Sequence, residues 1–311
     1  MFESRRGHTL KMPRHDTATH GRRATWLALG AIALWASLAA LATRLAQVPP
    51  FALVGVALGL GGLAGLRPAG LRAARPAALL LGVYGLFAYH LCLFLALRLA
   101  PPVEANLVNY LWPLLIVVLS PVLVRGPTLQ VRHVLGALSG FAGAALLVSG
   151  GRLAVPAEGL AGFLLAALAA LIWSTFSLLT KRLGHVPTST VSISCLVSGG
   201  LSLACHALLE PAWRPAAAEV PVLLFIGLGP MGAAFYLWDR ALKDGDPRTI
   251  GTLAYLTPLL STLLLAATGA GRITPLAFAA GGLIIGGAVV GNWPARPLRP
   301  PGSGEGSPVS G

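Results

Sequence analysis

The sequence predicts an all-α membrane protein with ten transmembrane helices, arranged as two inverted five-helix repeats. Three observations lead to this prediction: the composition of the chain, a series of apolar runs, and an internal repeat. The 311-residue chain is 55% hydrophobic, only 11% charged, and has a mean hydropathy of +0.75. A soluble domain carries about 25% charged residues, so this chain lacks the polar surface that a soluble protein shows to water.

Apolar runs follow one another along the chain, separated by short connections that contain Pro or Gly. A helix needs about 20 apolar residues to cross a bilayer, and the first run is longer than the apolar core of a signal peptide, about 7–15 residues. It is therefore expected to remain as a helix. A basic tail (1–25) and a C-terminal tail (294–311) are expected to be disordered. The predicted spans are 26–45, 50–66, 76–97, 103–124, 132–149, 159–180, 188–209, 220–242, 248–268 and 275–293.

Lys and Arg are unevenly distributed among the connections. When connections are assigned alternately to the two sides of a membrane, 18 of the 23 Lys and Arg residues fall on the side of the tails and 5 on the other. Basic residues accumulate on the cytoplasmic side, which predicts a multi-pass protein of the bacterial inner membrane with both termini cytoplasmic. The net charge of +13 is thus explained by topology within a lipid bilayer, and no nucleic-acid partner is expected.

The two halves of the chain resemble each other in sequence. At an offset of 138 residues Trp35 matches Trp173, and at an offset of 145 the motif Tyr-Leu-x-Pro-Leu-Leu at 110–115 recurs at 255–260. Repeat 1 then covers 26–149 and repeat 2 covers 159–293. Because each repeat has an odd number of spans, the second enters the membrane from the opposite side. Inverted repeats that hold a substrate near the midplane are typical of secondary transporters.

The segment Pro102–Leu115 and its counterpart Pro247–Leu260 resemble the EamA-type repeats of the drug/metabolite transporter superfamily. Within it, the segment 104–113 (EANLVNYLWP) resembles a subgroup that exports aromatic amino acids. The resemblance covers nearly the whole chain between the tails. It implies a monomer with a central cavity and efflux of aromatic and other neutral amino acids by alternating access, or of other small metabolites or drugs.

The predicted helix over 103–124 is the richest in polar side chains, which are costly inside a bilayer. Asn106, Asn109 and Pro113 share one face at spacings of three and four, and Tyr110 flanks it. Pro113 cannot donate to the carbonyl of Asn109, which could then accept from a substrate ammonium group. Alternatively, this proline and Pro258 in the other repeat only kink their helices, and the asparagines bond to neighbouring helices.

Aromatic side chains inside the spans are candidates for stacking on an aromatic substrate. Anchoring at the membrane interface is the alternative, but it explains Trp173 poorly, because this residue lies deep in its span and is followed by hydroxyl side chains. His90 is the one deep titratable group, either a proton relay or a neutral histidine bonded to a neighbouring helix. The full set of candidate substrate-binding residues is Tyr89, His90, Asn106, Asn109, Tyr110, Trp112, Trp173, Ser177 and Tyr255.

Several functions have no support in the sequence. There is no nucleophile elbow, no His-Glu-x-x-His motif and no phosphate-binding loop, so an enzyme is not expected. No His or Cys cluster has metal-ligand spacing, and no metal or cofactor is expected. Only Glu104 and Asp239 among the acids approach the hydrocarbon. Cargo that is neutral or zwitterionic fits best, and a channel or a non-transporting scaffold stays open as an alternative.

Overall fold

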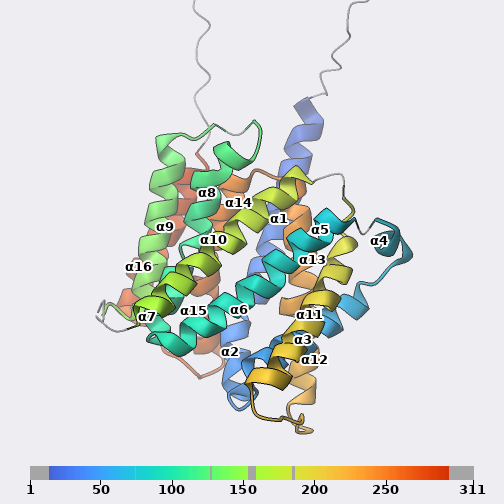
Figure 1. Cartoon of the computed structure of the whole chain (residues 1–311). Coiled ribbons are helices and arrows are strands. Elements are labelled where there is room, and N and C mark those ends of the chain that lie inside the picture. Colours follow the sequence, from blue (N-terminus) through green and yellow to red (C-terminus); the bar gives the residue numbers. More distant parts are fainter. Residues whose placement is uncertain (1–13, 74, 127, 153–158, 184–185, 294–311) are drawn as a thin grey trace, which may run out of the picture.

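The computed structural model describes residues 14–73, 75–126, 128–152, 159–183 and 186–293, and every regular element in these ranges is a helix. The elements form one bundle whose longer helices run between two ends (Figure 1). The first half contains α1 (Arg14–Ala36), α2 (Leu38–Ala42), η1 (Thr43–Leu45), α3 (Pro50–Ala64), α4 (Pro68–Ala73), α5 (Pro76–Val83), η2 (Tyr84–Ala88), α6 (Tyr89–Leu99), α7 (Pro102–Asn109), α8 (Trp112–Leu123) and α9 (Val131–Ser149). The second contains α10 (Leu160–Arg182), α11 (Thr190–Leu209), α12 (Val220–Leu228), η3 (Gly229–Ala233), α13 (Ala234–Asp244), α14 (Pro247–Ala254), α15 (Leu256–Ala267) and α16 (Pro275–Gly291).

Most of these helices are suited to a membrane. Within the described ranges, seven helical stretches are long and apolar enough to cross one, and Pro50–Ala64 and Pro275–Gly291 are shorter apolar helices. The seven are Pro76–Leu99, Pro102–Leu123, Val131–Ser149, Leu160–Arg182, Thr190–Leu209, Val220–Asp244 and Pro247–Ala267. Large apolar side chains such as Val122 and Leu208 stand exposed on the outside of the bundle. These features make the chain a multi-pass membrane protein.

The first predicted span, 26–45, is not one helix. Helix α1 ends at Ala36, where the hydroxyl of Ser37 donates to the carbonyl of Leu34 at 2.7 Å, and the chain continues in α2 and η1. A side-chain hydroxyl that bonds to nearby backbone competes with the helical ladder. Helix α1 begins at Arg14, so residues 14–25 of the predicted basic tail are helical rather than disordered. Near the end of this stretch, Ala24 is buried in the bundle. Residues 1–13 and 294–311 of the predicted tails lie outside the described ranges.

Matched irregularities occur in the two halves. The helix that begins at Pro76 contains a π-helical turn at η2, and the helix that begins at Val220 contains one at η3, 145 residues later. The next helix in each half is interrupted as well, at 110–111 between α7 and α8 and at Tyr255 between α14 and α15. This spacing equals the offset between the two Tyr-Leu-x-Pro-Leu-Leu motifs. π-helical turns are frequent at functional sites, which directs attention to the space that they border.

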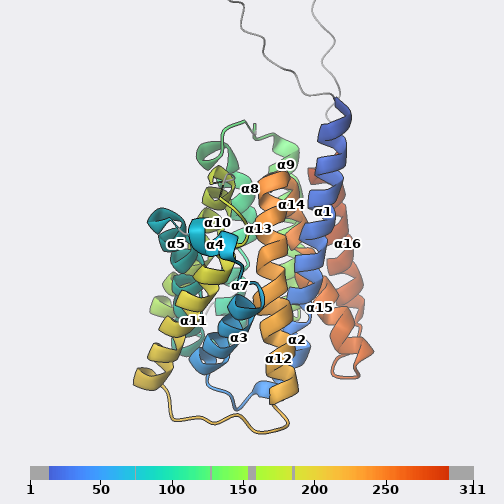
Figure 2. The same cartoon turned by 90° about the vertical axis from the view of Figure 1, so that its right-hand side faces the viewer.

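Helices from the two halves pack against each other in pairs: α9 with α16, α3 with α11, α1 with α13, and α6 with α10. Figure 2 shows α1 lying beside α13. Close approach depends on small residues, because a Cβ on Gly136 would lie 2.5 Å from the carbonyl oxygen of Gly287, and the reverse holds as well. These two glycines, part of the Gly-x-x-x-Gly motifs of α9 and α16, therefore serve packing within the chain.

Candidate functional site

A cavity of about 360 Å³ lies between the two halves of the bundle. This volume is within the usual range of small-molecule sites. From the first half, its lining includes residues at the end of α1, in α2 and in α3, and Figure 1 shows α2 at the end of the bundle opposite to the start of α1. It is lined by Trp35, Leu38, Leu53, Val54, Ala57, Tyr89, His90, Leu93, Phe94, Asn106, Asn109, Tyr110, Trp112, Trp173, Ile226, Met231, Phe235, Thr257 and Ser261.

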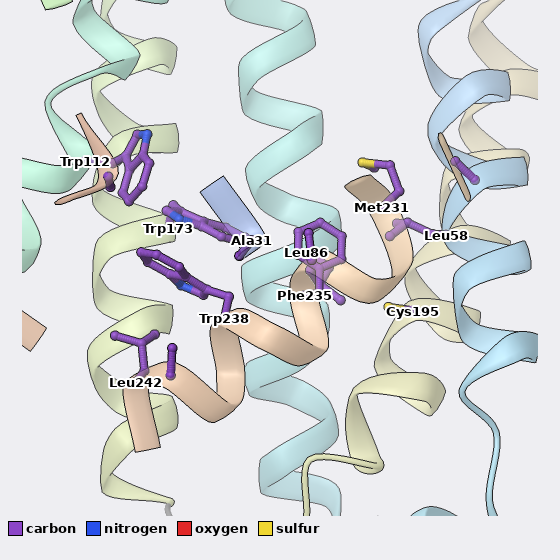
Figure 3. Close-up of a cluster of buried hydrophobic side chains, with 14 of the residues drawn as sticks. Ala31, Leu58, Leu86, Trp112, Trp173, Cys195, Met231, Phe235, Trp238 and Leu242 are labelled. Atoms are coloured by element: carbon purple, nitrogen blue, oxygen red, sulfur yellow. The ribbon is translucent and has the colours of Figure 1, made fainter. Parts of the chain in front are cut away.

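A cluster of aromatic rings forms part of the cavity wall. The ring centroid of Trp35 lies 5.7 Å from that of Trp173 and 5.1 Å from that of Trp238, and Trp112 lies 6.3 Å from Trp173. Edge-to-face and tilted contacts of this kind are favourable between aromatic rings. Figure 3 shows that the rings converge from different helices, with Trp173 between Trp112 and Trp238. We call Trp35, Trp112, Trp173, Phe235 and Trp238 the aromatic cluster.

A second, small hollow of about 40 Å³ lies beyond the aromatic cluster, and Trp173, Phe235 and Trp238 form part of its wall. Its other lining residues include Leu183 and Thr190, near the connection between α10 and α11. Two indole N–H groups of the cluster are tied to the fold: Trp35 donates to the carbonyl of Pro230 in η3 and Trp238 donates to Ser177, both at 3.1 Å. The cluster separates the cavity from this hollow, because Trp173 and Phe235 line both of them.

Two of the polar residues that line the cavity carry a buried polar atom without a hydrogen bond among the described residues. The amide nitrogen of Asn109 donates to the hydroxyl of Tyr89 at 3.3 Å, whereas its oxygen Oδ1 is buried without a hydrogen bond among the described residues. The hydroxyl of Thr257, from the other half, is also buried and unpaired there. Buried polar atoms are nearly always bonded. Both residues line the cavity, but these two atoms are covered in this conformation, so a ligand meets them only after a side-chain rotation.

His90 is oriented by its own helix. Its Nδ1 donates to the carbonyl of Leu86 in η2 at 2.5 Å, since a carbonyl only accepts. The sequence alternatives for His90 were a proton relay and a bond to a neighbouring helix, and the bond goes instead to the residue four positions earlier. This fixes the proton on Nδ1 and leaves Nε2 as the second ring nitrogen. The ring also lies 5.0 Å from that of Tyr89.

The structure brings most of the candidate residues together. Seven of the nine line the cavity: Tyr89, His90, Asn106, Asn109, Tyr110, Trp112 and Trp173. Ser177 does not, because it lies beyond the aromatic cluster and accepts the indole N–H of Trp238. Tyr255 does not either, because its side chain is fully buried and packs in a cluster with Val117, Ala137 and Ile284.

The two prolines lie where the helices are interrupted. Pro113 is in the first turn of α8, and Pro258 is in the first turn of α15. The amide of Leu115 bonds to the carbonyl of Leu111, so the helical ladder resumes directly after the first break. Proline lacks the amide hydrogen that would bond across the break. The first interruption places Asn109, Tyr110 and Trp112 on the cavity wall.

Several cavity residues were not among the sequence candidates: Trp35, Met231, Phe235, Thr257 and Ser261. Trp35 could have been found, because it is the repeat counterpart of Trp173 and the two rings are in contact. Thr257 and Ser261 are ordinary residues of an apolar helix, and only the three-dimensional structure shows which side of α15 faces the cavity.

Charged side chains lie away from the cavity. Among the residues that the structure describes, the lining contains no Asp, Glu, Lys or Arg. Glu210, at the end of α11, was missed in the sequence, and its side chain is fully buried. It pairs with Arg98 at 2.9 Å and accepts the amide N–H groups of Phe51 and Ala52 at the start of α3. An anion at a helix N-terminus is stabilised by the helix dipole, so Glu210 joins three helices and is satisfied without a ligand.

A ligand-sized aromatic cavity between the two halves of a helical membrane bundle is what a carrier of small molecules requires. The family comparison agrees, because residues 22–149 and 160–293 each match the EamA-like transporter family. The chain therefore belongs to this family, within the drug/metabolite transporter superfamily, and is a membrane transporter. One match falls on each half of the bundle described above.

Two curated relatives carry the same name. The chain is 42% identical over 282 residues to the "Aromatic amino acid exporter YddG" of Ancylobacter novellus, which covers 88% of this chain and 98% of that protein. It is 28% identical over 263 residues to the protein of that name from Salmonella typhimurium, covering 79% and 88% of the two chains. A solved structure titled "Crystal structure of protein" is similar with a TM-score of 0.83 and 41% identity, covering 88% of this chain and 97% of that one.

Proposed function

We propose that this protein exports aromatic and other neutral amino acids across the bacterial inner membrane by alternating access. The observation that carries the proposal is the cavity, whose wall combines aromatic rings with Asn109, a residue whose Oδ1 has no hydrogen bond among the described residues. The curated relatives that cover most of the chain are named as aromatic amino acid exporters. The chemistry of the lining supports the same cargo independently of those names.

An amino acid presents an ammonium group, a carboxylate and a side chain. The ammonium group has only donors, and Oδ1 of Asn109 is an unpaired acceptor. The hydroxyl groups of Thr257 and Ser261 come from the opposite half and can donate to a carboxylate. Trp173 and Trp112 offer aromatic surface for the cargo's ring. A lining without Lys or Arg suits a zwitterion better than a phosphorylated compound.

The ten-span, inverted arrangement is part of the proposal. Ten spans result when α1, the two shorter apolar helices and the seven long stretches all cross the membrane. Inversion is supported by the direction of α1, which runs from the top of Figure 1 downward, whereas its counterpart α10 runs upward. The matched breaks at an offset of 145 and the paired packing of the halves support it as well. The bias of Lys and Arg supports cytoplasmic termini, and we expect a monomer.

Alternating access requires that one end of the site is closed while the other is open. In the proposed topology the aromatic cluster, whose rings contact one another, is the closure toward the cytoplasmic end. At that end Asp239 forms a buried ion pair with Lys243 at 2.7 Å, and Lys243 also donates to the carbonyl of Val186 before α11. The proposed cycle separates the aromatic cluster and these contacts to admit cargo from the cytoplasm.

Counterflow in proteoliposomes tests the proposal. Vesicles are preloaded with unlabelled phenylalanine, labelled phenylalanine is added outside, and wild type is compared with Trp173→Ala and Asn109→Ala. Saturable overshoot that both variants lose supports an amino acid carrier with this cavity as its site. Flux that does not saturate indicates a channel. Absence of exchange with aromatic and aliphatic amino acids, in protein shown to be folded, contradicts amino acid export and favours other cargo of the family or a scaffold.

A further inference from the structure

Tyr255 has no contact with the cavity, yet its hydroxyl is inserted into the backbone of a cavity-lining segment. The amide N–H of Leu114 donates to the Tyr255 hydroxyl at 3.1 Å, and this hydroxyl donates to the carbonyl of Tyr110 at 3.4 Å. In an uninterrupted helix the amide of Leu114 would bond directly to the carbonyl of Tyr110. A side chain inserted into the ladder in this way opens or kinks a helix.

The hydroxyl acts beside Pro113, within the break between α7 and α8. Pro113 has no amide hydrogen, so the carbonyl of Asn109 receives no bond from the position four residues later. Leu114 supplies the next amide, and it is directed to Tyr255 instead of Tyr110. The helical bonds to the carbonyls of Asn109 and Tyr110 are therefore both missing between α7 and α8. The first loss follows from the sequence of this segment, and the second is imposed by a residue of the other half.

The ring of Tyr255 is held firmly in place. It is fully buried, and a Cβ on Gly140 of α9 would lie 2.5 Å from its Cδ2 atom. Phe141 contacts it at a centroid distance of 6.4 Å. Glycine at position 140 thus leaves the room that the ring occupies, and the hydroxyl has one accessible position.

The repeat counterpart of Tyr255 behaves differently. Tyr110 occupies the same position in the motif Tyr-Leu-x-Pro-Leu-Leu, but it lines the cavity. Tyr255 of the second half supports the break in the first half. Tyr110 of the first half lines the cavity. The repeat is therefore asymmetric at this position.

We infer that Tyr255 is a positioning residue, which holds the segment from Asn109 to Trp112 in the geometry that binds cargo. Without its hydroxyl, the amide of Leu114 and the carbonyl of Tyr110 lose their shared partner, and the segment from Asn109 to Trp112 is no longer held in its present position. This inference rests on the proposed function for its effect on cargo, but its structural part does not depend on what is transported.

Hydrogen exchange tests the structural part without any cargo. Wild type and Tyr255→Phe are compared by mass spectrometry in nanodiscs, with Tyr236→Phe as the matched control. The Tyr236 hydroxyl also donates to a backbone carbonyl of another helix, that of Gly61 at 3.0 Å, but Tyr236 is not part of the cavity wall. We expect exchange in 110–116 to rise about tenfold or more in Tyr255→Phe and to stay at the wild-type rate in the control. Wild-type exchange in Tyr255→Phe overturns the inference.

Transport kinetics test the effect on cargo. In Tyr255→Phe we expect the KM for phenylalanine to rise roughly three- to tenfold, as for loss of one neutral hydrogen bond, with Vmax per folded protein little changed. In an Asn109→Leu background the same substitution should raise KM less than it does in wild type, because one of the groups that it positions is gone. Equal effects in both backgrounds, or a loss of Vmax alone, overturn the positioning role. If wild type itself moves no amino acid, the proposed function fails, and the exchange result still decides the role of the hydroxyl in the break.

Discussion

Replacement of Asn109 by Leu should weaken cargo binding without weakening the fold. The amide oxygen of Asn109 is buried and unpaired, and the amide nitrogen makes one long bond of 3.3 Å to Tyr89. A buried unpaired polar atom costs about 1–3 kcal/mol of stability, and a neutral hydrogen bond contributes about 0.5–1.5 kcal/mol. Leucine has a similar size and removes both. The unfolding temperature should therefore stay the same or rise slightly.

The effect on binding should have the opposite sign. A hydrogen bond to a charged group contributes about 1.5–3 kcal/mol, and 1.4 kcal/mol is a factor of ten in affinity. Loss of the bond from the cargo's ammonium group to Asn109 should therefore raise the Kd for phenylalanine roughly 10- to 150-fold. A scintillation proximity assay with purified protein measures this Kd, and nanoscale fluorimetry measures the unfolding temperature of the same sample.

The control is Asn292→Leu. Asn292 follows α16 and is exposed, and its side chain bonds to the carbonyl of Ala288 at 2.8 Å. It should bind phenylalanine like wild type. Wild-type affinity in Asn109→Leu would refute the role of Oδ1 in binding. A clear fall in its unfolding temperature would instead refute the statement that this oxygen is unsatisfied without cargo.

Three further predictions concern stability. Glu210→Gln should lower the unfolding temperature more than Arg98→Gln, because the fully buried carboxylate also holds the start of α3, whereas Arg98 is 43% exposed; equal shifts would contradict this ranking. Burial alone would raise the pKa of Asp246. The hydrogen bonds and the charge of Arg248 together lower this pKa by more than burial raises it, so the pKa of Asp246 lies below the usual value for an aspartate. Asp246→Ala should lower the free energy of unfolding by about 1 kcal/mol at neutral pH. The stabilities of wild type and variant should converge as the pH falls through the lowered pKa of Asp246, because a group with a depressed pKa stabilises the fold only above that pKa. A stability difference that stays constant down to acid pH would contradict this prediction. Gly61→Ala should cost about 1–3 kcal/mol, because its Cβ would lie 2.7 Å from the Cα of Gly232, whereas Gly59→Ala, with nothing within 4 Å, should gain about 0.5–1 kcal/mol; thermal unfolding of both variants decides.

The helical membrane fold could be predicted because it depends on regular local patterns. Apolar runs of sufficient length and the Tyr-Leu-x-Pro-Leu-Leu repeat are visible in the sequence, and the breaks at 110 and 255 follow from the prolines. The early start of α1 and its end at Ala36 were not predicted. Both depend on tertiary packing of Ala24 and on a single hydroxyl bond at Ser37.

The cavity was predictable in part for a different reason. Polar and aromatic residues inside spans are rare, so Asn109, Trp112 and Trp173 stood out. Thr257 was missed because the sequence does not show which side of its helix faces the cavity. Met231 was missed because an apolar residue in a membrane span is not unusual. Tyr255 was a candidate because of its position in the repeat. Its actual contacts lie in the backbone of the other half, which a sequence pattern cannot reveal.

The central claim, that the cavity is the cargo site for aromatic amino acids, is tested most directly by protection of a thiol placed in it. Cys92, Cys195 and Cys205 are first replaced by Ser or Ala, and Ser261→Cys then introduces one thiol in the cavity wall. Thr268→Cys, at the exposed end of α15, is the control. Phenylalanine should slow modification of the Ser261→Cys thiol by a methanethiosulfonate reagent, with half-protection near the KM for transport, and should leave the control rate unchanged. A modification rate in the cavity that saturating phenylalanine does not alter would contradict the claim.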